Sequence, residues 1–167
     1  MSQPALVANP YARFLDSRSG QSIDEILSST PATFAALADA IGTDRIAVAS
    51  APGKWTPVEI FCHMADCEVA FGFRLRQTLA QEHHVMQPFD QDDWAKNYSR
   101  VSAEQALAAF AALREWNLIL IRNAPAGAAS KPVTHPERGT MTFATILETM
   151  AGHDINHTLQ LEKIAAA

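Results

Sequence analysis

The chain has 167 residues, of which 48% are hydrophobic and 19% are charged, a composition typical of one globular domain. Its 13 basic and 18 acidic residues give a net charge of −5 at pH 7, which excludes nucleic acid and anionic membrane surfaces as expected partners. No apolar run reaches the ~20 residues of a membrane-spanning helix, and the start of the chain lacks a signal peptide pattern. We therefore expect a soluble cytoplasmic protein in which Cys62 and Cys67 are free thiols.

The hydrophobic pattern predicts four helices and no strand. The first covers residues 22–41, and Pro31 within it predicts either a kink or a break followed by a new start. The second covers about residues 56–81 and begins with a capping box, in which Thr56 is the N-cap and Glu59 binds back to it. Three polar side chains of this helix are expected to face water: Glu68, Arg74 and Gln77.

The third helix is expected to begin at a capping box at Ser102 and to end near Asn123, and the fourth to follow Thr142 and reach the end of the chain. The connections are unusually long for a bundle: residues 42–55, 82–101 and 124–141. Because they are long enough to cross over an end of the bundle, the helices need not follow a simple up-and-down order. We expect a single domain over residues 1–167, an all-α four-helix bundle with long crossover connections. Residues 1–20 are expected to form an extension that packs on the bundle or trails from it.

Three histidines on two predicted helices form the strongest candidate for a functional site. His153 and His157 are four residues apart, so on a helix both imidazoles project from one face within reach of one metal ion. They share a stripe with apolar residues, and unpartnered polar groups in a core cost on the order of 1–3 kcal/mol each. His63 lies beside the apolar stripe of the second helix. From the spacing alone, a pair of core histidines is the simpler interpretation. The three histidines together favour a metal site between the second and fourth helices. Three protein ligands would leave coordination positions of the metal open for water or substrate.

The other candidates for chemistry are weaker. Glu59 and Asp154 could bind the N–H groups of the ligand histidines or act as general bases, although Glu59 also completes a capping box and Asp154 also fits a solvated surface position. Cys67 fits a small buried residue of the substrate pocket better than a metal ligand. Asp93 and Trp94 lie in the long second connection, which suits a segment that covers a substrate pocket. The remaining histidines have structural explanations in a loop or at a helix end: His83, His84 and His135.

Over nearly its whole length the sequence resembles the DinB-like superfamily of small metal-binding four-helix bundles. The similarity lies in six segments: NPYARFL at 9–15, PGKWT at 52–56 with Glu59 and His63, Asp66 with Glu68, Phe89–Asp90 with Asp93–Trp94, HPERG at 135–139, and HDxxHxxQ at 153–160. The resemblance implies one divalent metal ion bound by His63, His153 and His157, and a homodimer. It gives no support for Cys67 as a ligand. Several members of this superfamily transfer low-molecular-weight thiols or catalyse thiol-dependent isomerisation, which implies a small-molecule substrate.

Three functions are compatible with these residues, and the first of them is the one that we expect from the sequence. In the first, the metal activates a low-molecular-weight thiol cosubstrate for attack on an electrophilic small molecule, because a cation stabilises the thiolate. In the second, a hydrolase, the metal activates water, and Glu59 or Asp154 is the nearest general base. In the third, a non-catalytic stress or binding protein, the metal only ties two helices together, and no pocket is expected. Zinc and nickel are the first candidates for the metal and manganese and iron the next, because three histidines do not fix the coordination geometry.

Overall fold

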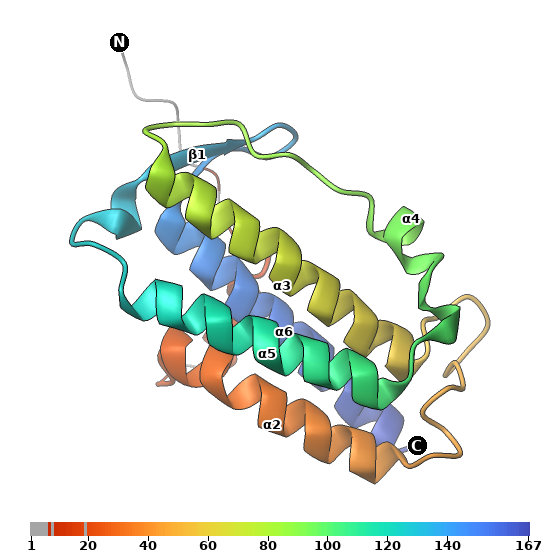
Figure 1. Ribbon diagram of the computed structural model, residues 1–167. Helices are drawn as coiled ribbons and strands as arrows, with labels where there is room; N and C mark the ends of the chain where they lie inside the picture. The colour runs from red at the N-terminus through yellow and green to blue at the C-terminus, as the bar shows by residue number, and fades with distance from the viewer. Residues whose placement is uncertain (1–6, 8, 19) are drawn as a thin grey trace.

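The structure is a computed structural model that describes residue 7, residues 9–18 and residues 20–167. Four long helices form a bundle (Figure 1): α2 (Ile23–Ile41), α3 (Pro57–Ala80), α5 (Ala103–Arg122) and α6 (Phe143–Ala165). A capping box begins each of them, with a serine or threonine as the N-cap: Ser22, Thr56, Ser102 and Thr142. The predicted all-α four-helix bundle is therefore confirmed.

The helices do not pack in the order in which they follow one another. α2 and α3 occupy opposite corners of the bundle, and each packs against both α5 and α6. In Figure 1, α3 and α5 run in one direction and α2 and α6 run in the other. Because α3 and α5 are parallel neighbours, the connection between them has to return along the whole length of the bundle. This topology explains the long crossover connections that the sequence predicts.

The connections contain short elements that the hydrophobic pattern does not predict. These are the helices α4 (Gln91–Ala95), η1 (Tyr98–Arg100) and η2 (Ala128–Ser130), and the strands β1 (Pro132–His135) and β2 (Gly139–Thr142). The two strands pair antiparallel, and the backbone of Thr134 also bonds to the segment after α3, where Met86 N donates to Thr134 O at 2.9 Å. The prediction of no strand is wrong, because four residues are too few for an alternating pattern to be recognised.

Pro31 lies inside α2 without ending it, since the helix is continuous from Ile23 to Ile41. Proline has no N–H, so the carbonyl of Leu27, four residues earlier, lacks its usual partner within the helix. Arg114 of α5 fills this place, and its Nη1 donates to Leu27 O at 2.9 Å. The break and new start, one of the two outcomes predicted at this proline, does not occur because a donor from another helix replaces the missing one.

A buried network of charges joins three helices at the centre of the bundle. Arg114 donates to both carboxylate oxygens of Asp154 on α6 and, through Nη2 at 2.8 Å, to Oε1 of Glu68 on α3. Asn117 Nδ2 donates to Glu68 Oε2 at 3.0 Å. Glu68, Arg114 and Asp154 are each 1% exposed. The prediction that Glu68 faces water is therefore wrong, because its partner is on another helix, where the periodicity of α3 cannot show it.

The N-terminal segment packs on α6 through α1 (Ala12–Asp16). Gly152 permits this contact, since a Cβ atom at residue 152 would lie 2.5 Å from Tyr11 Cβ. The Tyr11 ring meets the ring of His153 edge-on, with centroids 5.4 Å apart. The prediction for residues 1–20 falls partly on residues that the structure does not describe, namely 1–6, 8 and 19. It therefore stays a prediction.

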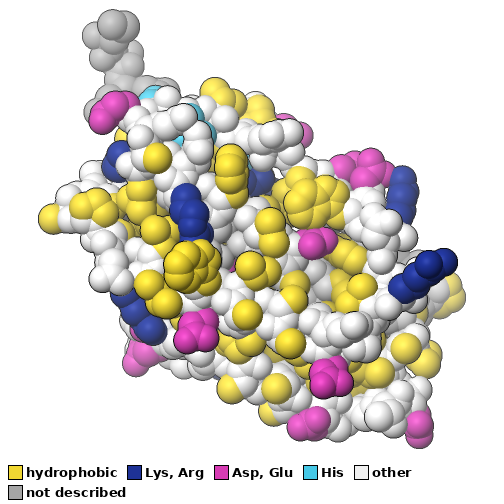
Figure 2. Space-filling model, viewed as in Figure 1, with side chains coloured by type: hydrophobic (Ala, Val, Ile, Leu, Met, Phe, Trp, Pro, Cys, Tyr) yellow, Lys and Arg dark blue, Asp and Glu magenta, His cyan; other side chains and the backbone are white. Residues whose placement is uncertain are grey.

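One face of the bundle exposes large apolar side chains. Figure 2 shows them spread over the face that carries α3 and α5, and four are about half exposed or more: Val69, Phe73, Trp116 and Ile119. Exposed apolar surface of this kind is typical of contact with another protein. Among the helices that the structure describes, none combines the length and the apolar character that crossing a membrane requires.

Candidate metal centre

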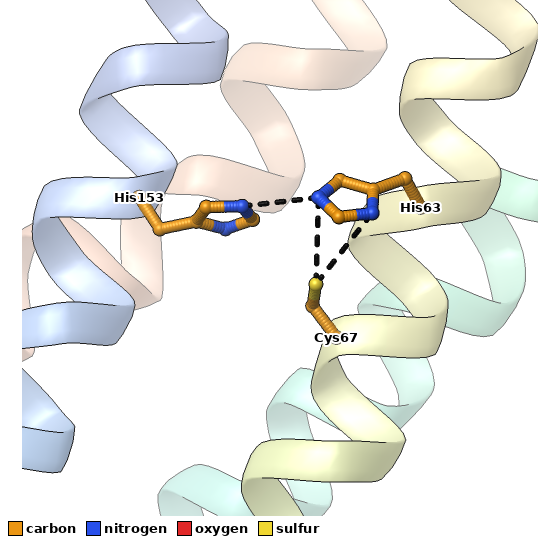
Figure 3. A group of neighbouring side chains, drawn as sticks. All are labelled: His63, Cys67 and His153. Carbon is orange, nitrogen blue, oxygen red and sulfur yellow. Dashed lines mark hydrogen bonds between the residues drawn. The ribbon is translucent and has the colours of Figure 1, made fainter. Parts of the chain in front are cut away.

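The three histidines predicted as metal ligands meet between α3 and α6. His153 Nε2 lies 3.1 Å from His63 Nε2 and 3.1 Å from His157 Nε2. α6 presents His153 and His157 one turn apart, and α3 brings His63 to them from the opposite side, as Figure 3 shows for His63 and His153. All three rings are buried, with exposed fractions of 3% to 8%. The structure therefore brings together the residues that the i, i+4 spacing and the third histidine indicate.

The positions of these nitrogens fit a divalent metal ion. Two nitrogens that each lie about 2.0–2.1 Å from one ion are about 2.9–3.4 Å apart in octahedral or tetrahedral coordination. The two separations of 3.1 Å fall in this range. A ring nitrogen carries either one N–H or one lone pair, so His153 Nε2 cannot form two normal hydrogen bonds with its two neighbours. A cation that accepts one lone pair from each ring satisfies all three nitrogens.

Burial keeps these imidazoles in the neutral form that binds metals. It lowers the pKa of His63 to about 3, with a smaller contribution from the nearby His157, and lowers the pKa of His153 well below its ordinary value. Burial also lowers the pKa of His157 to about 4, although a hydrogen bond with Gln160 opposes this shift. His157 Nδ1 lies 2.9 Å from Gln160 Oε1. Because an amide oxygen only accepts, Nδ1 carries the proton and the Nε2 lone pair faces the other rings.

Cys67 lies beside these rings, one turn after His63 on α3. Its Sγ is close enough to the nitrogens of His63 and His153 for the three to form a candidate ligand group (Figure 3). However, Sγ lies 3.5 Å from His63 Nε2 and 3.8 Å from Nδ1 of the same ring. The sulfur is thus almost equally far from both nitrogens and sits beside the ring, not in line with the Nε2 lone pair. Burial, assisted by the charge of Glu68, raises the pKa of the Cys67 thiol.

We expect Cys67→Ala to keep the metal and His157→Ala to lose it. The three nitrogens suffice to hold an ion, so the affinity for zinc should change less than about threefold in Cys67→Ala and fall at least about 100-fold in His157→Ala. Competition with a chromophoric chelator measures both affinities. The reverse pattern, with metal lost in Cys67→Ala and kept in His157→Ala, would show that the ligands are His63, Cys67 and His153.

A cavity of about 300 Å³ adjoins the histidines. His63, Cys67 and His153 form part of its wall, and the N-terminal segment, the connection after α3 and the turn between β1 and β2 complete it. The residues of this wall that the sequence did not name as site residues are Tyr11, Phe71, Arg74, Pro88, Phe89, Gln91, His135, Glu137, Arg138 and Thr149. Three of them belong to the HPERG segment at 135–139, which is one of the segments of the family resemblance and could have indicated them from the sequence.

Asp93 and Trp94, predicted for the substrate pocket, do not line this cavity. Asp93 is exposed and pairs with Lys96, and Trp94 lines a separate cavity of about 540 Å³ beside Cys62. Asp90 explains this placement, because its carboxylate accepts hydrogen bonds from the N–H groups of Asp92 and Asp93 and begins α4 there. The long connection contributes Phe89 to the histidine cavity instead.

Glu59 and Asp154, the two candidates for a general base, are both occupied elsewhere. Glu59 Oε2 accepts a hydrogen bond from Thr56 N at 2.7 Å, as the capping box predicts. Asp154 is bound by Arg114 through both oxygens, and burial raises the pKa of its carboxyl although Arg114 opposes the shift. Neither residue lines the histidine cavity. The interpretation of Asp154 as a solvated side chain is wrong, because it is 1% exposed.

A helical bundle with histidines that converge beside a cavity describes the class of this protein, and comparison with known sequences gives the family. Residues 26–161 match the DinB superfamily, and the chain belongs to that superfamily. This result confirms the resemblance that the sequence motifs indicate.

Two similar proteins extend the comparison. A protein of Oceanobacillus iheyensis that is named a putative metal-dependent hydrolase is 25% identical over 113 residues, which cover 67% of this chain and 66% of the relative's length. The solved structure of YfiT from Bacillus subtilis, described as a probable metal-dependent hydrolase with an unusual four-helix bundle topology, matches with a TM-score of 0.74. At 17% identity, this match covers 98% of the chain and 91% of YfiT, and it shows that the two share a fold.

Proposed function

We propose that this protein is a metal-dependent enzyme that acts on a small molecule at His63, His153 and His157. The observation that carries the proposal is the convergence of three buried, neutral ring nitrogens beside a cavity of about 300 Å³. A purely structural metal site is closed by protein ligands, whereas a catalytic site keeps a position open. The adjoining cavity therefore favours an enzyme over the non-catalytic binding protein, for which we expected no pocket.

Hydrolysis is the reaction that we propose first, because the names of both similar proteins include a metal-dependent hydrolase. When bound at the three histidines, a divalent cation supplies Lewis-acid chemistry for a substrate oxygen and makes a bound nucleophile more acidic. The protein's own residues position the reactants. His135 Nδ1 accepts a hydrogen bond from Glu137 N at 3.2 Å, so the neutral ring has its Nε2–H for donation to a substrate. Glu137 lines the cavity, and we propose its carboxylate as the proton acceptor in place of Glu59 and Asp154.

Transfer of a low-molecular-weight thiol is the second candidate, and the positions of Glu59 and Asp154 favour it. Both carboxylates predicted as bases are engaged in other bonds. A thiol depends less on a separate base, because a nearby cation by itself favours loss of the thiol proton. Cys67 is buried, so in this mechanism the reacting thiol enters from solution as a cosubstrate.

Assays with and without thiol distinguish the two reactions. We expect protein loaded with zinc, nickel, manganese or iron to hydrolyse activated aryl esters without added thiol. We also expect the rate to fall at least about 100-fold after chelation or in His157→Ala, since the cation provides most of the polarisation. Turnover that appears only when cysteine or glutathione is added would replace hydrolysis by thiol transfer. Absence of turnover with every metal, with and without thiol, would contradict the enzyme proposal.

The homodimer that the family resemblance implies is also a proposal for this chain. Sedimentation velocity at micromolar protein concentration measures it directly. A single species with the mass of one chain would contradict it.

A further inference from the structure

We propose that the substrate of the histidine cavity carries an anionic group, a carboxylate or a phosphate, which Arg74 and Arg138 bind. The other end of such a molecule then lies toward His63 and His153. The part of the inference that concerns the anionic group depends only on the cavity. The part that concerns the reacting end of the molecule rests on the proposed function.

Arg74 lies in the wall of the cavity, with its guanidinium near two aromatic rings. It follows His63, Cys67 and Phe71 along one face of α3. Its guanidinium carbon lies 5.9 Å from the ring centre of Phe71 and 5.6 Å from that of Phe89. Nη2 donates to Gln87 O at 3.3 Å. The prediction that Arg74 faces water is wrong, because the connection after α3 folds back over this side chain and half-buries it.

Arg138 reaches the same cavity from the turn between β1 and β2. Burial lowers the pKa of Arg74, Cys67 opposes this shift, and the positive charge of Arg138 adds to it, as expected for two guanidiniums that line one cavity. Within the described part of the chain, neither forms an ion pair with a carboxylate. Both guanidiniums are therefore available to bind an anion that enters the cavity.

The other polar groups of the cavity leave its charge positive. Glu137 is exposed and provides one negative charge against the two arginines. His135 is neutral, because burial and the charges of Arg138 and Arg74 lower its pKa. Its Nε2–H is a further hydrogen-bond donor. An anion in the cavity is therefore attracted by two positively charged guanidiniums and can accept a hydrogen bond from at least one neutral donor.

The chemistry of arginine selects carboxylates and phosphates among anions. A guanidinium presents its N–H groups as a planar fork that matches two oxygens of a carboxylate or a phosphate. The volume of about 300 Å³ is at the lower end of the range for small-molecule sites, which favours a compact organic anion.

Calorimetric titration of the 167-residue chain with succinate and, separately, with inorganic phosphate tests the inference. We expect one or both to bind, before and after removal of metal by a chelator. Arg74→Gln and Arg138→Gln should each weaken binding about tenfold or more, because each removes a charge-assisted contact. Glu137→Gln should strengthen binding, because it removes the opposing charge. Arg100→Gln is the matched control, since Arg100 is an exposed arginine outside the cavity, and its affinity should equal that of the parent.

Three outcomes would overturn the inference: no binding of either anion at millimolar concentration, equal affinity in the parent and both cavity variants, or binding that disappears with the metal but not with the arginines. Arg138 is exposed on a turn, so Arg138→Gln provides a test even if Arg74→Gln fails to fold. Comparison of succinate with phosphate identifies the preferred group. Anion binding that persists in a protein without any turnover would contradict the proposed function and leave this inference intact.

Discussion

His153→Ala is expected to remove the metal, leaving less than about a tenth of the single equivalent expected in the parent protein. The reason is the central position of this residue, since its Nε2 is the nitrogen that lies 3.1 Å from both of the other two. Its loss leaves two imidazoles on different helices. Mass spectrometry of the metal content, on untagged protein purified without a nickel column, measures the effect.

His83→Ala is the control for this experiment. His83 is exposed, and its Nε2 lies 2.8 Å from Thr134 Oγ1, away from the metal centre. The metal content of His83→Ala should equal that of the parent protein. If the parent is purified without metal, titration with zinc and with nickel decides between a lost ion and an absent site. A full equivalent of metal in His153→Ala would contradict the three-histidine centre.

Arg114→Met is expected to lower the free energy of unfolding by about 3–5 kcal/mol. The guanidinium is 1% exposed and is bound by two carboxylates that are as deeply buried, Glu68 and Asp154. Methionine fills a similar space but leaves both carboxylates without their counter-ion, and buried unpaired charges are strongly unfavourable. The substitution also removes the donor to Leu27 O that Pro31 makes necessary. Equilibrium unfolding in urea, followed by circular dichroism, measures the loss.

Arg122→Met on the same helix is the matched control. Arg122 also pairs with a carboxylate, since its Nε donates to Asp24 Oδ1 at 2.8 Å, but both side chains are about half exposed. An exposed ion pair contributes about 0–1 kcal/mol, so this variant should stay close to the parent. Equal losses in the two variants would show that the buried network has no special role in stability.

The sequence by itself determined the four long helices and the identity of the convergent histidines. Capping boxes and hydrophobic periodicity are local properties, so they placed the beginnings of all four long helices correctly. The i, i+4 spacing is also local, and it put His153 and His157 on one face of α6. The length of the connections indicated that the helices need not follow a simple up-and-down order.

The tertiary structure decided everything that depends on a partner from another helix. Glu68 looked like a surface residue on α3 and is buried because Arg114 approaches from α5. Pro31 remains inside a helix for the same reason, because an arginine that is distant in sequence binds the free carbonyl. Periodicity describes the faces of one helix, but the neighbour that covers each face determines whether a charge there is solvated or paired.

The cavity beside the histidines was also decided by the tertiary structure. Its wall combines the N-terminal segment, α3 with the loop that follows it, and α6 with the hairpin turn that precedes it, so three separate parts of the chain have to meet. The sequence therefore identified the candidate ligands and the connection that contributes to the pocket, but it named Asp93 and Trp94 as the pocket residues of that connection, where the structure places Phe89. Helix ends and spacings follow from contacts within a few residues, whereas the shape and charge of a pocket follow from how distant segments pack together.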